Sequence, residues 1–201
     1  MTDIFGIDGR FFRFVTKVSN LILLNILWII FSIPIITVGA ATSAVYYVTI
    51  KMVKNEEGYI IKSFCSAFRE NLKQGIILEL VLLTSGVILV GDIRYFLFMS
   101  NTVGYIFAAI FSIGLTIYVL ALIYVFPLVA KYNNTLSGTL KNAVIMSFKH
   151  LPSSISLAVL LIIMLYGFYI SVHLMIIFSV IGAAGYAYFG SILFRSFFEN
   201  K

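Results

Sequence analysis

Glu79 is the side chain whose type and position point most directly to chemistry. It is an acidic residue well inside a stretch predicted to span a membrane, where a carboxylate costs roughly 2.5–3.5 kcal/mol on insertion scales. A carboxylate retained at that cost can couple a proton or a solute to movement. The structural alternative is that Glu79, about one helical turn from the end of its span, reaches water, Lys73 or a neighbouring helix. Both interpretations stay open at the level of sequence.

The other residues that could do chemistry are isolated from one another. His150 and His173 are predicted to lie on opposite sides of the membrane, which excludes a shared metal. Cys65 is the single cysteine, so neither an internal disulfide nor a cysteine-based metal site can form. Asp92 and Arg94 fall in an outer turn, where an exposed ion pair contributes little. No metalloprotease, nucleophile-elbow or phosphate-loop motif is present. The chain is therefore predicted not to be an enzyme, with no catalytic, cofactor-binding or metal-binding residue.

Composition places these residues in a membrane protein. Apolar residues make up 61% of the 201 residues and charged residues 11%, against about 25% charged residues in soluble domains. The net charge is +6, but the basic residues lie between apolar runs. They therefore indicate membrane topology and contact with anionic headgroups rather than nucleic acid binding. The predicted partner is the lipid bilayer, and the chain forms one membrane domain.

The first apolar run decides how the chain crosses the bilayer. Residues 18–50 carry no charge and would form a straight helix about 50 Å long, whereas the hydrocarbon core is about 30 Å thick. Pro34 removes a backbone donor and disfavours helix before it. We therefore expect two short spans, 18–33 and 36–50. The alternatives are one span over 18–39 followed by a helix that leaves the membrane, or a re-entrant second half.

The distribution of basic residues favours six spans over five. The later spans are predicted near 75–91, 103–127, 153–171 and 174–194. With a hairpin at residues 18–50, both termini lie on one side, together with 13 of the 14 Lys and Arg residues, and only Arg94 lies on the other. With a single first span the division is 10 against 4. Because basic residues stay cytoplasmic, the six-span arrangement with cytoplasmic termini is preferred.

The predicted fold is an all-α polytopic transmembrane bundle of six helical segments, with five as the alternative. Short amphipathic helices are expected on its cytoplasmic side. Within the single domain, 1–201, the expected segments are an interfacial N-terminal segment with Asp8 as helix N-cap (1–17), a Pro-broken hairpin (18–50), an amphipathic loop (51–74), a second hairpin (75–127), a second amphipathic loop (128–152), a third hairpin (153–194) and a tail (195–201).

Small and polar residues in the first hairpin are expected to pack helices together. Gly39 and Ser43 form a small-xxx-small pair, which lets helices approach closely, and polar side chains in lipid usually bond to neighbouring helices. The sharper alternative is a docking face for a partner's transmembrane helix or for a second copy of the chain. The candidate functional or packing positions are Asn25, Pro34, Thr37, Gly39, Ser43 and Glu79. A functional centre is expected where residues 34–47 meet Glu79.

The same hairpin carries a resemblance to a known family. The segments Leu24–Trp28, Pro34–Gly39 and Ala40–Tyr46, followed by the basic, aromatic element Phe64–Asn71, resemble the YesL family of bacterial integral membrane proteins. The dense part of the resemblance is confined to residues 20–75.

The resemblance implies a context and no catalytic residue. Members of the family have poorly defined functions and are similar in setting to carbohydrate uptake systems of Gram-positive bacteria. The implied role is a non-enzymatic accessory or regulatory protein of the bacterial cytoplasmic membrane, with a sugar ABC transporter as partner. The alternative is a small solute transporter or channel, acting alone or as an oligomer.

Overall fold

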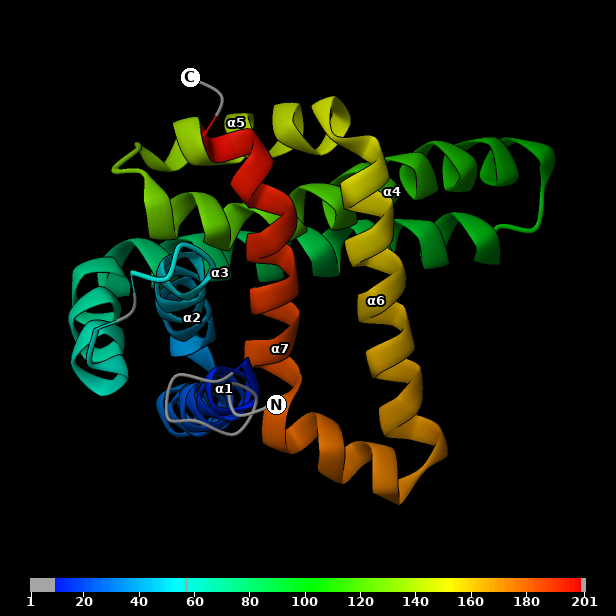
Figure 1. The fold of residues 1–201 in the computed structure, drawn as a ribbon. Coiled ribbons are helices and arrows are strands. Elements are labelled where there is room, and N and C mark those ends of the chain that lie inside the picture. The colour runs from blue at the N-terminus through cyan, green and yellow to red at the C-terminus, as the bar shows by residue number, and fades with distance from the viewer. Residues whose placement is uncertain (1–9, 57, 200–201) are drawn as a thin grey trace.

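The chain folds into helices that surround a small interior (Figure 1). The computed structural model describes residues 10–56 and 58–199. Over these residues it has no strand, which confirms the predicted all-α class. The expected N-cap Asp8 lies outside the described residues. The elements are α1 (Arg10–Ser32), the short 3-10 helix η1 (Ile35–Thr37), α2 (Val38–Val53), α3 (Ile60–Phe98), α4 (Thr102–Lys131), α5 (Leu136–Lys149), α6 (Leu151–Ile170) and α7 (Val172–Glu199).

Six helical segments in the described part of the chain are long and apolar enough to cross a membrane. This confirms the predicted number, and every predicted span overlaps one of them. They are Phe11–Ser32, Ile35–Val53, Ile60–Phe98, Thr102–Lys131, Leu151–Ile170 and Val172–Arg195.

The first apolar run is broken at Pro34, so it forms two helices. Pro34 is extended, with φ −74° and ψ 110°. The Thr37 hydroxyl donates at 2.7 Å to the carbonyl oxygens of Phe31 and of Pro34. The Phe31 carbonyl oxygen thereby gains a partner at the helix break, while the Pro34 carbonyl oxygen also accepts from the Thr37 backbone N–H at 2.9 Å. Two features therefore define the turn between α1 and α2: the restricted φ angle of Pro34 and the hydrogen bonds of the Thr37 side chain.

Helix α2 is the central element. Ten of its sixteen residues are buried, most of them small, because α1, α3, α4 and α7 all pack around it. Small side chains allow helix axes to approach closely and gain van der Waals contact in lipid. The buried residues of α2 are Gly39, Ala40, Ala41, Ser43, Ala44, Val45, Tyr46, Val48, Thr49 and Met52.

Helix α3 differs from the sequence expectation, because residues 60–73 are its first turns and not a separate surface helix. The apolar side chains of this amphipathic segment form a stripe in which Phe64 is fully buried, and its ring lies 5.3 Å from that of Phe31. The stripe therefore packs into the protein. With 39 residues, α3 is about 58 Å long, about twice the thickness of the hydrocarbon core. Residues 10–17 likewise belong to α1, whereas α5 is a separate short helix at residues 136–149, near the position expected.

The hairpin of α3 and α4 extends past the other helices as an arm (Figure 1). The distal arm comprises residues 83–98 and 102–120. Over these stretches α3 has no buried residue and α4 has two. The arm is held mainly by its own contacts, such as the stacking of Phe96 on Phe107 with ring centroids 5.0 Å apart. Its outer surface is apolar, with Val87 and Ile110 well exposed.

The start of α1 and the end of α7 meet at one loop. The Lys17 ammonium donates to the Asn55 side-chain oxygen at 3.1 Å, and the Arg195 guanidinium donates to the Val53 carbonyl at 3.5 Å. Both contacts are made at the connection between α2 and α3. Basic residues near the two ends of the chain therefore gather at the same end of the first hairpin.

Candidate functional site

Glu79 meets residues 34–47, as predicted, and its side chain contacts the backbone of α2. Its side chain is 8% exposed, and its Oε2 atom accepts a hydrogen bond of 2.6 Å from the Gly39 backbone N–H. Gly39 is the second residue of α2, where N–H groups have no partner within the helix. The partial positive charge of a helix N-terminus also favours a carboxylate. Glu79 of α3 therefore caps α2 across the helix–helix contact.

The cap requires an unusually close approach of the two helices. A Cβ atom added at Gly39 would lie 2.9 Å from the Gly75 carbonyl oxygen and 2.7 Å from the Phe126 ring. Ser43, fully buried, donates to the Gly39 carbonyl oxygen at 2.9 Å. Glycine at both contact positions removes the side chains that would hold α2 and α3 apart. The close packing places the Gly39 N–H within reach of Glu79.

Asn25 forms a second polar contact, between α1 and α7. Its side chain is 1% exposed, and its amide nitrogen donates to the Ser179 carbonyl oxygen at 2.7 Å. Its side-chain oxygen accepts from the Ala184 backbone N–H at 3.1 Å. Both partners are backbone groups within α7, which changes direction between its orange beginning and its red end (Figure 1). A side chain that inserts into the backbone ladder is a recognised cause of a helix bend.

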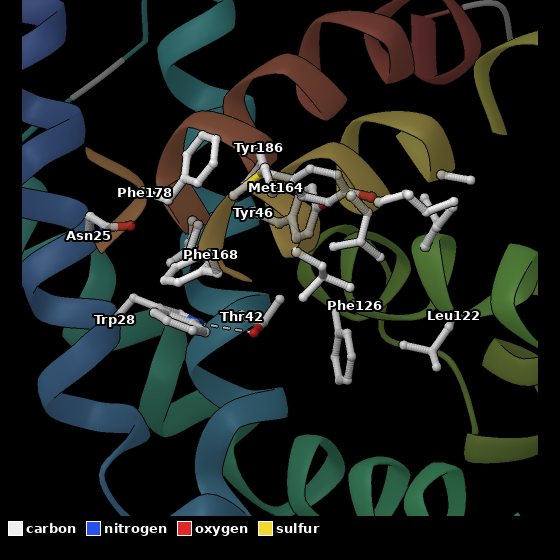
Figure 2. A pocket seen from close by; sticks show the side chains of 18 of the residues that line it. Asn25, Trp28, Thr42, Tyr46, Leu122, Phe126, Met164, Phe168, Phe178 and Tyr186 are labelled. Carbon is white, nitrogen blue, oxygen red and sulfur yellow. Dashed lines mark hydrogen bonds between the residues drawn. The ribbon is translucent and has the colours of Figure 1, made fainter. Parts of the chain in front are cut away.

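A cavity of about 790 Å³ lies beside these contacts, between α1, α2, α4, α6 and α7. Figure 2 shows Trp28 of α1 on one side and Phe126 and Leu122 of α4 on the other. The Trp28 indole N–H donates to the Thr42 hydroxyl at 3.0 Å, so the polar edge of the indole is already satisfied. The remaining walls are almost entirely apolar side chains.

The structure brings four of the six candidate positions together. Thr37, Gly39, Ser43 and Glu79 lie around the first turns of α2. Pro34 is exposed and sets the turn that precedes them. Asn25 belongs to the contact with α7 and lines the cavity.

The cavity also has lining residues that sequence analysis did not select. Trp28, Tyr46, Phe126 and Tyr186 come from four different helices. Each lies in a stretch without charged residues, where an aromatic residue facing a cavity has the same sequence pattern as one facing lipid. The signal that could have identified Trp28 and Tyr46 is their position in the segments that carry the family resemblance.

The titratable groups outside the spans are dispersed. His150 and His173 lie at opposite ends of α6, about 30 Å apart along its axis. Burial, with a smaller contribution from the positive charge of Lys149, lowers the pKa of His150. Among the described residues, no three His, Cys, Asp or Glu side chains lie close enough to hold a metal ion.

Six candidate spans around an apolar interior define a multi-pass integral membrane protein. Residues 21–93 match the family described as "Protein of unknown function, DUF624", and the resemblance to the YesL-type membrane proteins is thereby confirmed for this segment. All six candidate positions lie within the matched residues. Neither a curated protein nor a solved structure matches the chain.

The capping contact predicts different outcomes for two substitutions at Glu79. Glu79→Leu leaves the Gly39 N–H without an acceptor and is expected to lower the free energy of unfolding by about 1–3 kcal/mol. Glu79→Gln keeps a side-chain oxygen in place and is expected to unfold close to the wild-type temperature. Thermal unfolding of the purified variants in one detergent checks both. If Glu79→Gln is as damaging as Glu79→Leu, the hydrogen bond is not what the carboxyl group contributes.

Proposed function

We propose that this protein is a non-enzymatic accessory or regulatory component of a bacterial carbohydrate uptake system. The setting is what the YesL-type resemblance implies, and the family match over residues 21–93 supports the resemblance itself. The observation that carries the accessory role is the distal arm. A two-helix arm with exposed apolar residues on both helices, beyond the packed part of the protein (Figure 1), offers a surface to the transmembrane helices of a partner.

The buried polar groups support an accessory protein over an independent transporter. The Glu79 carboxyl, the Asn25 amide and the Thr49 hydroxyl each bond within the protein, the last to Ser191 at 2.8 Å. Groups used in this way stabilise helix contacts. A solute path needs such groups to face a passage, and the cavity between the helices is lined mainly by hydrocarbon.

The proposed orientation places both termini in the cytoplasm of the bacterial cell. The meeting of Lys17 and Arg195 with the loop after α2 supports this, because basic residues are retained on the cytoplasmic side. A cysteine introduced at Ile35, between α1 and α2, should then react with an impermeant reagent from outside, and one at Phe5 should not.

Site-specific photo-cross-linking in the native membrane tests the accessory role. A photoreactive residue at Val87 or Ile110 in the distal arm is expected to cross-link to a membrane subunit of an ABC-type sugar importer. Ile162 in α6 is the matched control, since it is similarly apolar and exposed but lies outside the arm. Equal yields from Ile162 would argue against the arm as the contact. Two results together would favour the transporter alternative over this proposal. No importer subunit would be found among the cross-linked products, and the protein alone would carry solute across the membrane of proteoliposomes.

A further inference from the structure

The cavity between α1, α2, α4, α6 and α7 has the size of a small-molecule site. Its volume is about 790 Å³, within the range of roughly 300–1,000 Å³ typical of ligand pockets. A transmembrane helix about 10 Å wide and 30 Å long occupies roughly 2,400 Å³. The cavity is therefore too small to hold a spanning helix of a partner or of a second copy.

The rim of the cavity faces the apolar exterior of the helices. Ile29, Ile162 and Leu165 line it and are also 42%, 63% and 62% exposed. In a membrane protein, apolar surface of this kind is in contact with hydrocarbon. A molecule that enters here comes laterally from the bilayer. No charged side chain lines the cavity among the described residues, so a charged headgroup would lack a partner inside it.

Two tyrosine side chains in the cavity lining carry hydroxyl groups that can hydrogen bond with a ligand. Tyr46 is 3% exposed and lines the cavity, and within the described residues its hydroxyl makes no hydrogen bond. The same holds for Tyr186, whose ring also reaches the cavity (Figure 2). By contrast, the nearby Tyr124 hydroxyl pairs with Ser154 at 2.8 Å. Tyr46 and Tyr186 both line the cavity, so each hydroxyl is available to hydrogen bond with a ligand oxygen, a bond typically worth about 0.5–1.5 kcal/mol.

We propose that this cavity binds an uncharged membrane lipid. Its hydrocarbon chain fills the apolar walls, and its hydroxyl or ester carbonyl oxygen hydrogen bonds with Tyr46 and Tyr186. The apolar lining, the lateral opening and the two hydroxyls each select for this chemistry. The lipid site does not rest on the proposed accessory role, because it depends only on the cavity and its own residues.

Trp28 provides a reporter for the test, because it is the single tryptophan of the chain and it lines the cavity. Bromine atoms on a lipid chain quench indole fluorescence only at short range. The full-length protein in detergent is titrated with a monoacylglycerol that carries a dibrominated stearoyl chain. Saturable quenching that an unbrominated monoacylglycerol reverses is the expected result. A dibrominated phosphatidylglycerol, whose headgroup is anionic, is expected to bind at least tenfold more weakly.

Substitutions separate the cavity from general contact with detergent and lipid. Ala158→Phe fills the cavity and is expected to abolish the saturable component. Val159→Phe, at the next position of α6, adds the same ring to an exposed residue outside the lining and is expected to bind as wild type. Tyr46→Phe keeps the ring and should weaken binding roughly three- to tenfold. Each variant is compared at equal helicity and elution volume.

Native mass spectrometry gives an independent readout. The wild-type protein extracted from membranes is expected to carry one neutral lipid, which the double variant Tyr46→Phe, Tyr186→Phe loses. Three results would overturn the proposal. These are quenching that rises linearly with lipid content, equal quenching in Ala158→Phe, and equal binding of the anionic lipid. Conversion of the protein to a dimer that excludes added lipid would assign the cavity face to a second copy instead.

Discussion

Replacing Gly75 by alanine is expected to lower the free energy of unfolding by about 1–3 kcal/mol. A Cβ atom at this position would lie 2.7 Å from both the backbone nitrogen and the Cα atom of Ala40, and 2.9 Å from its Cβ. Backbone atoms cannot rotate away as a flexible side chain can, so α2 and α3 must separate. Separation would also lengthen the 2.6 Å hydrogen bond between Gly39 and Glu79. One methyl group therefore disturbs both the packing and the cap.

Gly91→Ala is the matched control, because Gly91 lies in the same helix and a Cβ added there meets no atom within 4 Å. Alanine is a better helix former than glycine by about 1 kcal/mol, so this variant is expected to be as stable as the wild type or slightly more stable. Thermal unfolding in one detergent measures both variants. If Gly75→Ala and Gly91→Ala unfold at the same temperature, the close contact of α2 with α3 does not contribute to stability.

The span pattern could be predicted from the sequence because most charged residues lie between long apolar stretches. The break at Pro34 could also be predicted locally, because a proline ring restricts the conformation of the residue before it in any environment. The meeting of residues 34–47 with Glu79 followed from the small residues after Pro34 and from the position of the carboxyl group. These features depend on local composition and on short sequence separations.

The nature of the Glu79 contact could not be predicted in the same way. The sequence left open whether the carboxyl group reaches water, Lys73 or a neighbouring helix, and it did not indicate a backbone group as the partner. The carboxyl group instead reaches the Gly39 N–H, since an unpaired donor at a helix start inside lipid needs an acceptor. The continuity of α3 was missed because charged residues near its start resemble a surface loop. No proline interrupts residues 60–98, so the helix continues through them.

The cavity and the Asn25 contact depend on packing between distant segments. Asn25 hydrogen bonds with Ser179 and Ala184 of α7, which are separated from it by 154 and 159 positions in the sequence. Hydropathy determines which residues lie in a span, but it does not determine which neighbours a span acquires. The register between α1 and α7 therefore had no signal in the sequence, and neither did the packing of five helices that places Tyr46 at the cavity.

Asn25→Leu is expected to lower the free energy of unfolding by about 1–3 kcal/mol. The substitution removes the acceptor of the Ala184 N–H, which is buried, and the donor to the Ser179 carbonyl oxygen, which is part-buried. The average side-chain hydrogen bond between membrane helices contributes about 0.6 kcal/mol. A larger loss is expected here because one side chain serves two backbone groups at a bend.

Asn20→Leu is the control in the same helix, because Asn20 is only half-buried and is expected to tolerate an apolar side chain. Asn25→Asp keeps the acceptor for Ala184, and a protonated carboxyl group also offers one O–H donor to the Ser179 carbonyl oxygen, so a smaller loss than that of Asn25→Leu is expected at a pH where the group is protonated. Thermal unfolding measures stability, and Trp28, one turn further along α1, reports local change through its emission. If Asn25→Leu is as stable as Asn20→Leu, α7 can straighten so that its backbone N–H and carbonyl groups hydrogen bond with one another without the asparagine. The bend would then be set by the packing of α7 on α2 and α6, and not by the asparagine.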